Sequence, residues 1–195
     1  MKSPPPGSTQ PADEAERTLL LDKPQFDDAF RLWVARIREA LSSPEAGNSK
    51  WALVGVKRRG AVLARRLRKE LSAVIPSLLY GEVDISLYRD DYHLQTGKPQ
   101  VLGTEIAFPV DGVKILLVDD VLYTGRTVRA AMDLILDFGR PRVISLAVFI
   151  DRGHRELPIA ANFVGREIST RRQDLVKVRL EEMGEQDGVE IIRWR

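Results

Sequence analysis

Short apolar segments alternate along the chain with amphipathic helical segments, and this alternation limits the possible folds more than any other feature. The apolar segments lie at residues 51–56, 113–118 and 143–150. The first two are each followed by a glycine-containing turn and then by a helical stripe, at residues 61–71 and 128–136. Apolar strands separated by helices are typical of a parallel sheet that helices cover on both faces. The sequence therefore predicts an α/β domain with a central, mostly parallel sheet.

Further elements are predicted around this sheet. Residues 82–88 and 105–108 read as strands, and the polar stretch between them, residues 89–100, is long for a hairpin loop. Residues 175–180 and 189–194 read as an antiparallel pair. A helix from near Pro24 to before Pro44 is predicted by apolar residues that recur at three- and four-residue steps: Phe26, Phe30, Trp33, Val34, Ile37 and Leu41.

The first residues have a different composition. Prolines stand among Ser, Thr, Gly and acidic residues there, and such a segment buries too little apolar surface to offset the entropy of ordering. We therefore expect a disordered tail over residues 1–22 and one folded domain over residues 23–195. A chain of 195 residues is consistent with a single domain.

The composition excludes several classes of site. The chain contains no Cys, which excludes disulfides, thiolate zinc sites and a cysteine nucleophile, and its two His are too few for an imidazole metal cage. No apolar run approaches the roughly 20 residues that span a bilayer. The N-terminus also lacks the apolar stretch of a secretory signal. We therefore expect a cytoplasmic protein without a membrane segment.

The charges are nearly balanced but unevenly distributed. There are 30 Lys and Arg against 28 Asp and Glu, which gives a net charge of +2. Basic residues nevertheless crowd residues 57–69. Such a cluster is either an anion-binding face or a solvated helix face, and the sequence leaves both interpretations open.

The most informative segment is ILLVDDVLYTGRT at residues 115–127. The apolar run places Asp119 and Asp120 at the end of a central strand, where charged groups need a cleft and hydrogen-bond donors. Residues 124–127 then open a helix with hydroxyl groups and a glycine, an arrangement that binds phosphate. Either half alone is also common in caps and turns. Acceptors for sugar hydroxyls followed by amides for a phosphate favour a site for a ribose 5-phosphate.

The string VDDVLYTGRT at residues 118–127 resembles the phosphoribosyl pyrophosphate (PRPP) motif of type I phosphoribosyltransferases. The strings LVGVKRRG at 53–60, DISLYRDD at 84–91 and DRGHRELP at 151–158 stand in the order seen in the PyrR family, whose members combine uracil phosphoribosyltransferase activity with attenuation of pyrimidine operons. The resemblance covers residues 26–192. It implies the type I fold, with helices flanking the sheet, a small hood and a flexible lid hairpin at residues 89–100.

The resemblance also implies a reaction, in which uracil and PRPP give UMP and pyrophosphate. Magnesium would be bound mostly through substrate oxygens and water, so that the protein alone holds no metal. The implied catalytic residues are Asp119, Asp120 and Arg89, and the implied base-binding residues are Arg152, Gly153 and His154, although His154 could equally be an ordinary surface histidine. The implied PRPP-binding residues are Lys57, Arg58, Arg59, Gly60, Val121, Leu122, Tyr123, Thr124, Gly125, Arg126 and Thr127.

The part of the resemblance that concerns RNA is weaker. Ala160 stands where the family commonly has an Arg, and Ala35 and Glu39 align near a Thr and a His that the family presents to RNA. A carboxylate facing phosphates is unfavourable. Arg155 and Arg166 remain as candidates for binding the leader mRNA of a pyrimidine operon in response to UMP. The open alternatives are a phosphoribosyltransferase for another base and an enzyme that has lost attenuation; in either case the resemblance implies a homodimer or higher homo-oligomer.

Overall fold

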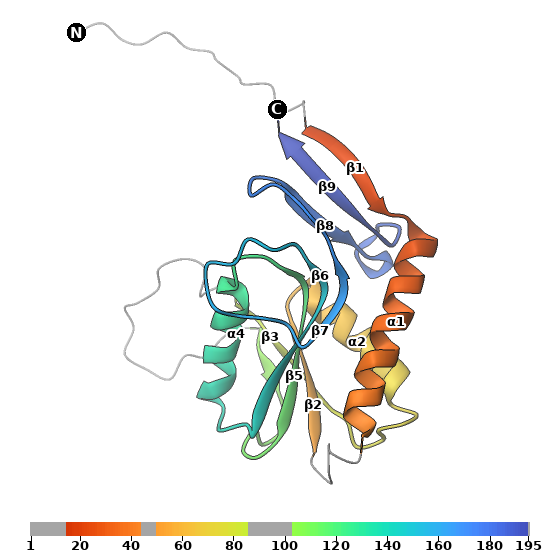
Figure 1. The fold of residues 1–195 in the computed structure, drawn as a ribbon. Coiled ribbons are helices and arrows are strands. Elements are labelled where there is room, and N and C mark those ends of the chain that lie inside the picture. The colour runs from red at the N-terminus through yellow and green to blue at the C-terminus, as the bar shows by residue number, and fades with distance from the viewer. Residues whose placement is uncertain (1–14, 44–49, 86–102, 195) are drawn as a thin grey trace, which may run out of the picture.

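A computed structural model describes residues 15–43, 50–85 and 103–194, and its main body is a six-stranded sheet between two layers of helices (Figure 1). The strand order is β4-β3-β2-β5-β6-β7, and all neighbours are parallel except β3 and β4. The strands are β2 (Trp51–Val56), β3 (Leu79–Val83), β4 (Glu105–Ile106), β5 (Lys114–Leu122), β6 (Val143–Asp151) and β7 (Phe163–Glu167).

Three helices cover the two faces of this sheet. Helices α1 (Lys23–Ser42) and α2 (Arg59–Leu71) lie on one face, and α4 (Arg126–Asp137) lies on the other (Figure 1). Alternate side chains of the central strands point to opposite faces. Leu53, Leu116 and Phe149 therefore pack with α1 and α2, whereas their neighbours Val54, Leu117 and Val148 pack with α4.

A second sheet of three antiparallel strands has the order β1-β9-β8 and forms a smaller layer above the main sheet (Figure 1). It consists of β1 (Ala15–Leu21), β8 (Leu175–Arg179) and β9 (Gly188–Trp194), with a 3-10 helix, η2 (Glu181–Met183), between the last two. We call these four elements the hood. Arg152, directly after β6, donates to the carbonyl of Asp174 at 2.5 Å, so the hood lies beside the carboxyl end of β6.

The predicted α/β class, the mostly parallel sheet and the antiparallel C-terminal pair are confirmed. The tail predicted over residues 1–22 is wrong for residues 15–21, because these residues pair with β9 as strand β1; residues 1–14 lie outside the described part. Strand β7 was not predicted, and the predicted strand at 82–88 begins earlier, at Leu79. Residues 86–102, with Arg89 and the predicted lid, also lie outside the described part. No helix in the described ranges is both long and apolar enough to cross a membrane.

Candidate functional site

Asp119 and Asp120 lie in the last part of β5, against the first turn of α2. Asp119 is 5% exposed, and its Oδ1 accepts the backbone N–H of Asp120 at 2.9 Å. Burial raises the pKa of Asp120 above its ordinary value, although a hydrogen bond with Asp119 and the charge of Arg59 act in the opposite direction. The pair thus presents carboxylate oxygens at the end of a central strand, as predicted.

Gly60 allows the loop before α2 to approach this pair of carboxylates. A Cβ atom at Gly60 would lie 2.6 Å from the carbonyl oxygen of Val118 and 2.9 Å from Cα of Asp119. Contacts this short exclude every residue with a side chain unless the backbone moves. The glycine therefore brings the backbone of residues 57–60 directly beside the carboxylates.

The three basic residues of this loop point in different directions. Lys57 Nζ lies 3.3 Å from Glu105 and 3.6 Å from Glu82, which turns it towards β3 and β4. Arg59 Nε donates to the carbonyl of Val178 in the hood at 2.7 Å. Arg58 is exposed, and the peptide bond between Lys57 and Arg58 is cis. Of the three, Arg59 is the one whose charge acts on Asp120.

Residues 123–127 form the turn from β5 into α4. Gly125 has a φ of 92°, a left-handed conformation that favours glycine, and it is the cap residue of α4. The carbonyl of Thr124 accepts the backbone N–H groups of Glu156 at 3.0 Å and Leu157 at 3.1 Å, which fixes the turn from behind. The amides of a first helical turn have no acceptor within the helix and favour an anion there. The turn thus has the backbone conformation and the helix N-terminus on which the predicted phosphate site depends.

The residues after β6 form a tightly bonded loop. Gly153 and His154 have φ values of 72° and 60°, and His154 Nε2 lies 2.8 Å from the carbonyl of Thr170. Arg152 is 4% exposed, and its guanidinium donates to the carbonyls of Asp174 at 2.5 Å and Arg171 at 2.8 Å. The terminal nitrogens of Arg152, expected to contact a base, are therefore engaged by backbone carbonyls.

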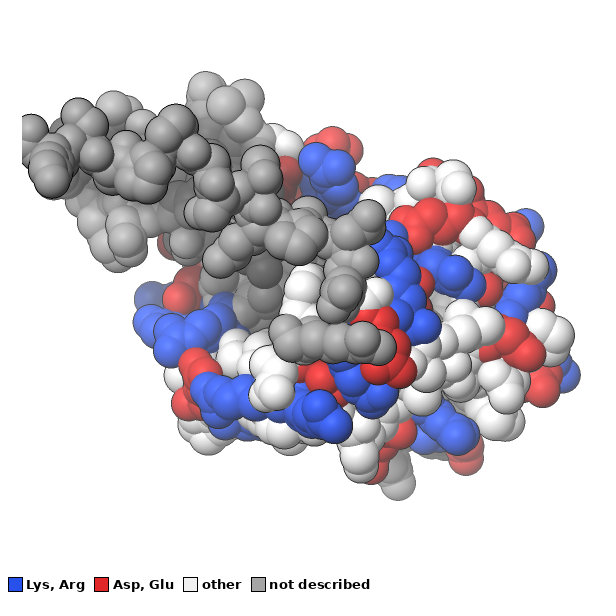
Figure 2. All heavy atoms as spheres, turned by 90° about the horizontal axis from the view of Figure 1, so that it is seen from above, with Lys and Arg blue, Asp and Glu red and all other residues white. Residues whose placement is uncertain are grey.

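Of the residues expected to contact RNA, Arg155 is engaged within the protein. Its Nη1 donates to the carbonyls of Tyr123 at 2.9 Å and Gly153 at 3.0 Å, and its Nη2 pairs with Asp151. Arg166, by contrast, is exposed on β7. On the face shown in Figure 2, basic and acidic side chains lie interspersed over the described surface.

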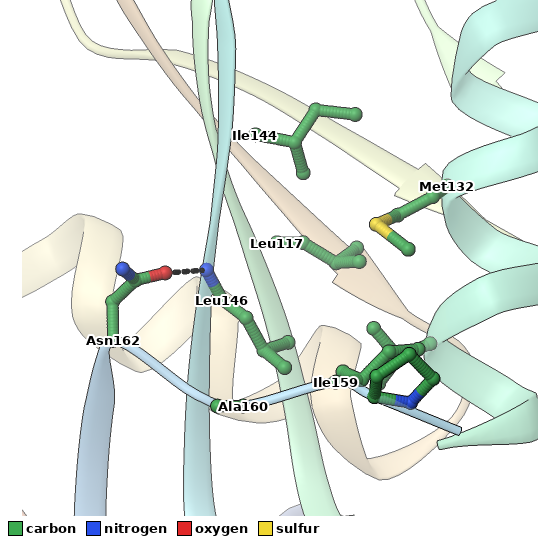
Figure 3. A pocket seen from close by; sticks show the side chains of 9 residues that line it. Leu117, Met132, Ile144, Leu146, Ile159, Ala160 and Asn162 are labelled. Carbon is green, nitrogen blue, oxygen red and sulfur yellow. Dashed lines mark hydrogen bonds between the residues drawn. The ribbon is translucent and has the colours of Figure 1, made fainter.

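A separate pocket of about 230 Å³ lies between α4 and the sheet. Figure 3 shows Met132 of α4 and Leu117, Ile144 and Leu146 of the sheet directed towards one another there. Ala160, at the position where an Arg was expected for RNA, is also part of its wall. The wall carries no charged side chain, and Asn162 Oδ1 is bonded to the Leu146 N–H at 2.8 Å. This pocket therefore offers no group for phosphoribosyl chemistry.

Glu156 is a residue of the site that sequence reasoning missed. Its backbone N–H donates to the carbonyl of Thr124, and its carboxylate pairs with Arg126 at 2.9 Å and with Arg172. The only signal in the sequence is its place inside the string DRGHRELP. It connects the predicted phosphate turn to the loop after β6.

Comparisons with known proteins agree with this geometry. Residues 17–180 match the family described as Phosphoribosyl transferase domain. Bifunctional protein PyrR of Roseiflexus sp. (strain RS-1) is 48% identical over 171 residues, which cover 85% of this chain and 92% of that protein. Bifunctional protein PyrR of Pelotomaculum thermopropionicum is 44% identical over 178 residues, covering 91% and 96%.

Solved structures show the same fold at low sequence identity. A hypoxanthine-guanine phosphoribosyltransferase of Bacillus anthracis aligns with a TM-score of 0.67 and 14% identity, covering 92% of this chain and 100% of that chain. A hypoxanthine phosphoribosyltransferase of Staphylococcus aureus aligns with a TM-score of 0.60 and 17% identity, covering 82% and 80%. The type I phosphoribosyltransferase fold is thereby confirmed. The PyrR relatives described above narrow the assignment from this fold to one family. The chain belongs to the PyrR family of the phosphoribosyltransferases.

Proposed function

We propose that the chain transfers the phosphoribosyl group of PRPP to uracil, forming UMP and pyrophosphate, and that it also regulates pyrimidine operons by UMP-responsive binding to leader mRNA. The observation that supports the enzymatic part is the position of Asp119 and Asp120 between two glycine-dependent loops. One loop lies so close to Asp119 at Gly60 that a Cβ atom there would come within 2.9 Å of the Asp119 Cα, and the other loop, at Gly125, starts α4. The PyrR relatives support uracil as the base.

The two carboxylates act on the sugar. Breaking the bond between C1 of the ribose and pyrophosphate develops positive charge on the ring, and this reaction needs no covalent nucleophile. Asp119 and Asp120 accept hydrogen bonds from the ribose hydroxyls and stabilise that charge. Rate acceleration then comes from positioning and from electrostatics that are already in place.

The two ends of PRPP bind to the two loops. Backbone N–H groups of residues 123–127, together with the N-terminus of α4, hold the 5-phosphate. Residues 57–60 lie on the other side of the carboxylates, where their amides and the Arg59 guanidinium neutralise the leaving pyrophosphate. Arg89, outside the described residues, is proposed as a further pyrophosphate contact.

Magnesium fits this site as a companion of the substrate. No group of three His, Cys, Asp or Glu side chains in the described ranges forms a metal cage. Mg²⁺ retains waters and binds phosphate oxygens with only one or two carboxylates from the protein. Asp119 and Asp120 are the carboxylates available to it or its waters. When bound, the ion neutralises charge on the pyrophosphate.

A competition assay tests the enzymatic proposal. With PRPP and magnesium, the purified protein should convert uracil to UMP, and neither orotate nor hypoxanthine should compete at equal concentration. Conversion of orotate or hypoxanthine in preference to uracil would establish a phosphoribosyltransferase for another base. Absence of any nucleotide product would contradict the proposal.

The regulatory part is supported by the PyrR relatives, which are named bifunctional, and by the exposed Arg166. Three residues argue against RNA binding because they replace the family's RNA-contacting residues: Ala160, Ala35 and Glu39. Arg155 also argues against it, because its guanidinium is bonded within the protein. Binding to the leader RNA of the protein's own operon should therefore be measured with and without UMP. We expect binding that UMP strengthens. Binding that is independent of UMP at moderate salt would favour an enzyme that has lost attenuation.

We also propose that the chain forms a homodimer or higher homo-oligomer. Sedimentation under the same conditions tests this proposal.

A further inference from the structure

Arg152 is a buried charge that the proposed mechanism does not use. Its side chain makes hydrogen bonds to the carbonyls of Asp174, Arg171 and Arg172, at 2.5, 2.8 and 3.3 Å. In the described ranges no carboxylate lies within ion-pair distance of it, and its Nε is buried without a hydrogen-bond partner. Burying a guanidinium without an ion-pair partner costs free energy, which indicates that its contacts have a specific role.

Tyr123 also binds the backbone segment that Arg152 contacts, residues 171–174. Its ring lies 4.1 Å below the Arg152 guanidinium carbon, and its hydroxyl donates to the carbonyl of Arg172 at 2.9 Å. A cation stacked on an aromatic face is attracted to it, and the attraction is stronger where water is excluded. Arg152 and Tyr123 therefore form one unit that binds the backbone of residues 171–174, which we call the hood turn because it leads into β8.

This unit joins segments that border different parts of a nucleotide. Tyr123 begins the turn proposed to hold the 5-phosphate, and the Arg152 backbone N–H donates to the carbonyl of Leu122 at 3.1 Å. Thr170, the residue directly before the hood turn, contacts the loop after β6, where the base is expected. Its Oγ1 donates to the carbonyl of Arg152 at 3.3 Å, and its carbonyl lies 2.8 Å from His154 Nε2.

We infer that Arg152 is a positioning residue that, with Tyr123, couples the phosphate turn at residues 123–127 to the hood turn. This coupling fixes the binding position of the sugar phosphate relative to that of the base. Arg152 acts through the backbone of the hood turn and not by contact with the base. This inference rests on the proposed function, because it assumes that a nucleotide 5-phosphate binds at residues 123–127.

Hydrogen exchange in the presence of ribose 5-phosphate tests the coupling without requiring turnover. This probe fills the sugar-phosphate half of the site and leaves the base position open. In the wild-type protein it should slow amide exchange at residues 124–127 and also at residues 168–176, by about fivefold or more, the factor of one hydrogen bond. In Arg152→Lys, which keeps the charge but loses the forked geometry, protection should remain at 124–127 and disappear at 168–176.

Two milder variants keep the test valid if Arg152→Lys fails to fold. Tyr123→Phe keeps the ring under Arg152 and removes the bond to Arg172, and Asp174→Asn weakens the bond from the Arg171 N–H to Asp174 Oδ2, which measures 2.9 Å. Both should reduce protection at 168–176 and raise KM for uracil while KM for PRPP changes little. The matched control is Arg36→Lys, a change in another arginine that donates to backbone carbonyls, in this case those of Val164 at 2.5 Å and Gly165 at 3.5 Å. It should lower Tm without changing the ratio of the two KM values.

Each outcome decides between the claims. Protection at 124–127 without protection at 168–176 in the wild type, or undiminished coupling in Arg152→Lys, would overturn the coupling and leave the proposed function intact. Coupled protection in a protein that forms no UMP would support the coupling and contradict the proposed reaction. No protection at either segment would contradict both.

Discussion

At the scale of single residues, the charge of Asp120 depends on its neighbours. Burial raises the pKa of this carboxyl group, and the nearby positive charge of Arg59 lowers it again. The proposed reaction uses the ionised form, because only a carboxylate stabilises positive charge on the sugar. Activity should therefore be lost as the pH falls through the pKa of Asp120, above the usual range of an aspartate.

Replacing Arg59 by Gln should move this loss of activity to higher pH. Without the Arg59 cation, one of the interactions that oppose the effect of burial on Asp120 is lost, so the pKa of Asp120 rises further and protonation begins at a higher pH as acid is added. The measurement is the pH profile of kcat/KM for UMP formation in both proteins. Arg38→Gln, at an exposed position of α1, is the control and should leave the profile in place. An acid limb that stays at the wild-type pH in Arg59→Gln would contradict the coupling.

Gly125 offers a second test at the residue scale. Alanine there would adopt a left-handed conformation at a cost of about 1–2 kcal/mol, and its Cβ would lie 3.3 Å from Ile159. Gly125→Ala should lower the free energy of unfolding and weaken binding of ribose 5-phosphate.

The control for this change is Gly112→Ala, because Gly112 has a similar φ of 72° and open space around its Cβ position. It should show a comparable loss of stability by urea denaturation with unchanged affinity for ribose 5-phosphate by calorimetry. Equal losses of affinity in the two variants would mean that residues 123–127 do not bind the phosphate.

At the scale of elements, an ion-pair network fastens the hood to helix α2. Arg66 of α2 contacts both carboxylate oxygens of Asp187, at 2.7 and 2.8 Å, and also Glu182. Burial alone would raise the pKa of Asp187, but its bonds with Arg66 and with the Glu181 N–H hold that pKa below its ordinary value. The hood carries Val178, the acceptor of Arg59, so this network also supports the pyrophosphate side of the site.

Asp187→Asn should destabilise the protein by about 2 kcal/mol at pH 7, because Arg66 loses the buried one of its two carboxylate partners and keeps only Glu182. Since the pKa of Asp187 is depressed in the folded state, its contribution is present above about pH 4 and is lost as the pH falls through the folded value. The difference between wild type and variant in urea unfolding should therefore shrink in acid. Asp28→Asn, in an exposed pair with Arg31, should change stability by less than about 0.5 kcal/mol. A difference that persists unchanged at low pH would contradict this account of Asp187.

The elements differ in how well their sequences predict them. Helix α1 has periodic apolar residues and strands β2, β5 and β6 have continuous apolar runs, and the sequence predicts all four elements from them. Strand β5 continues to Leu122, beyond the predicted end at residue 118. Strand β1 has no such signal, because only Leu21 within it is buried and its pairing with β9 forms it. Strand β7 is short and lies at the sheet edge, where few of its residues are covered.

The same distinction applies to the site. The position of Asp119 and Asp120 follows from the apolar run before them, and the phosphate turn follows from Gly125. The role of Arg152 does not follow from the sequence, because its partners are backbone carbonyls, which any residue type could supply. A guanidinium read from sequence suggests a ligand contact, whereas its bonds here lie inside the protein.

At the scale of the whole molecule, the net charge of +2 conceals extensive internal pairing. The basic residues at 57–69 were expected to form an anion-binding face or a solvated helix face. Several of them instead pair with acids on other elements: Arg65 with Glu82, and Arg66 with Glu182 and Asp187. These pairs hold α2 to β3 and to the hood, whereas Arg58, Arg68 and Lys69 of the same cluster are exposed.

The central claim is that Asp120 stabilises the sugar while two glycine-dependent loops hold the phosphates. Its most direct test is the rate of UMP formation by Asp120→Asn at saturating uracil and PRPP, with Tm measured on the same preparation. We predict a fall in kcat of about a hundredfold or more with Tm nearly unchanged, because the amide keeps the shape of the side chain but not its charge. Wild-type turnover by this folded variant would contradict the claim.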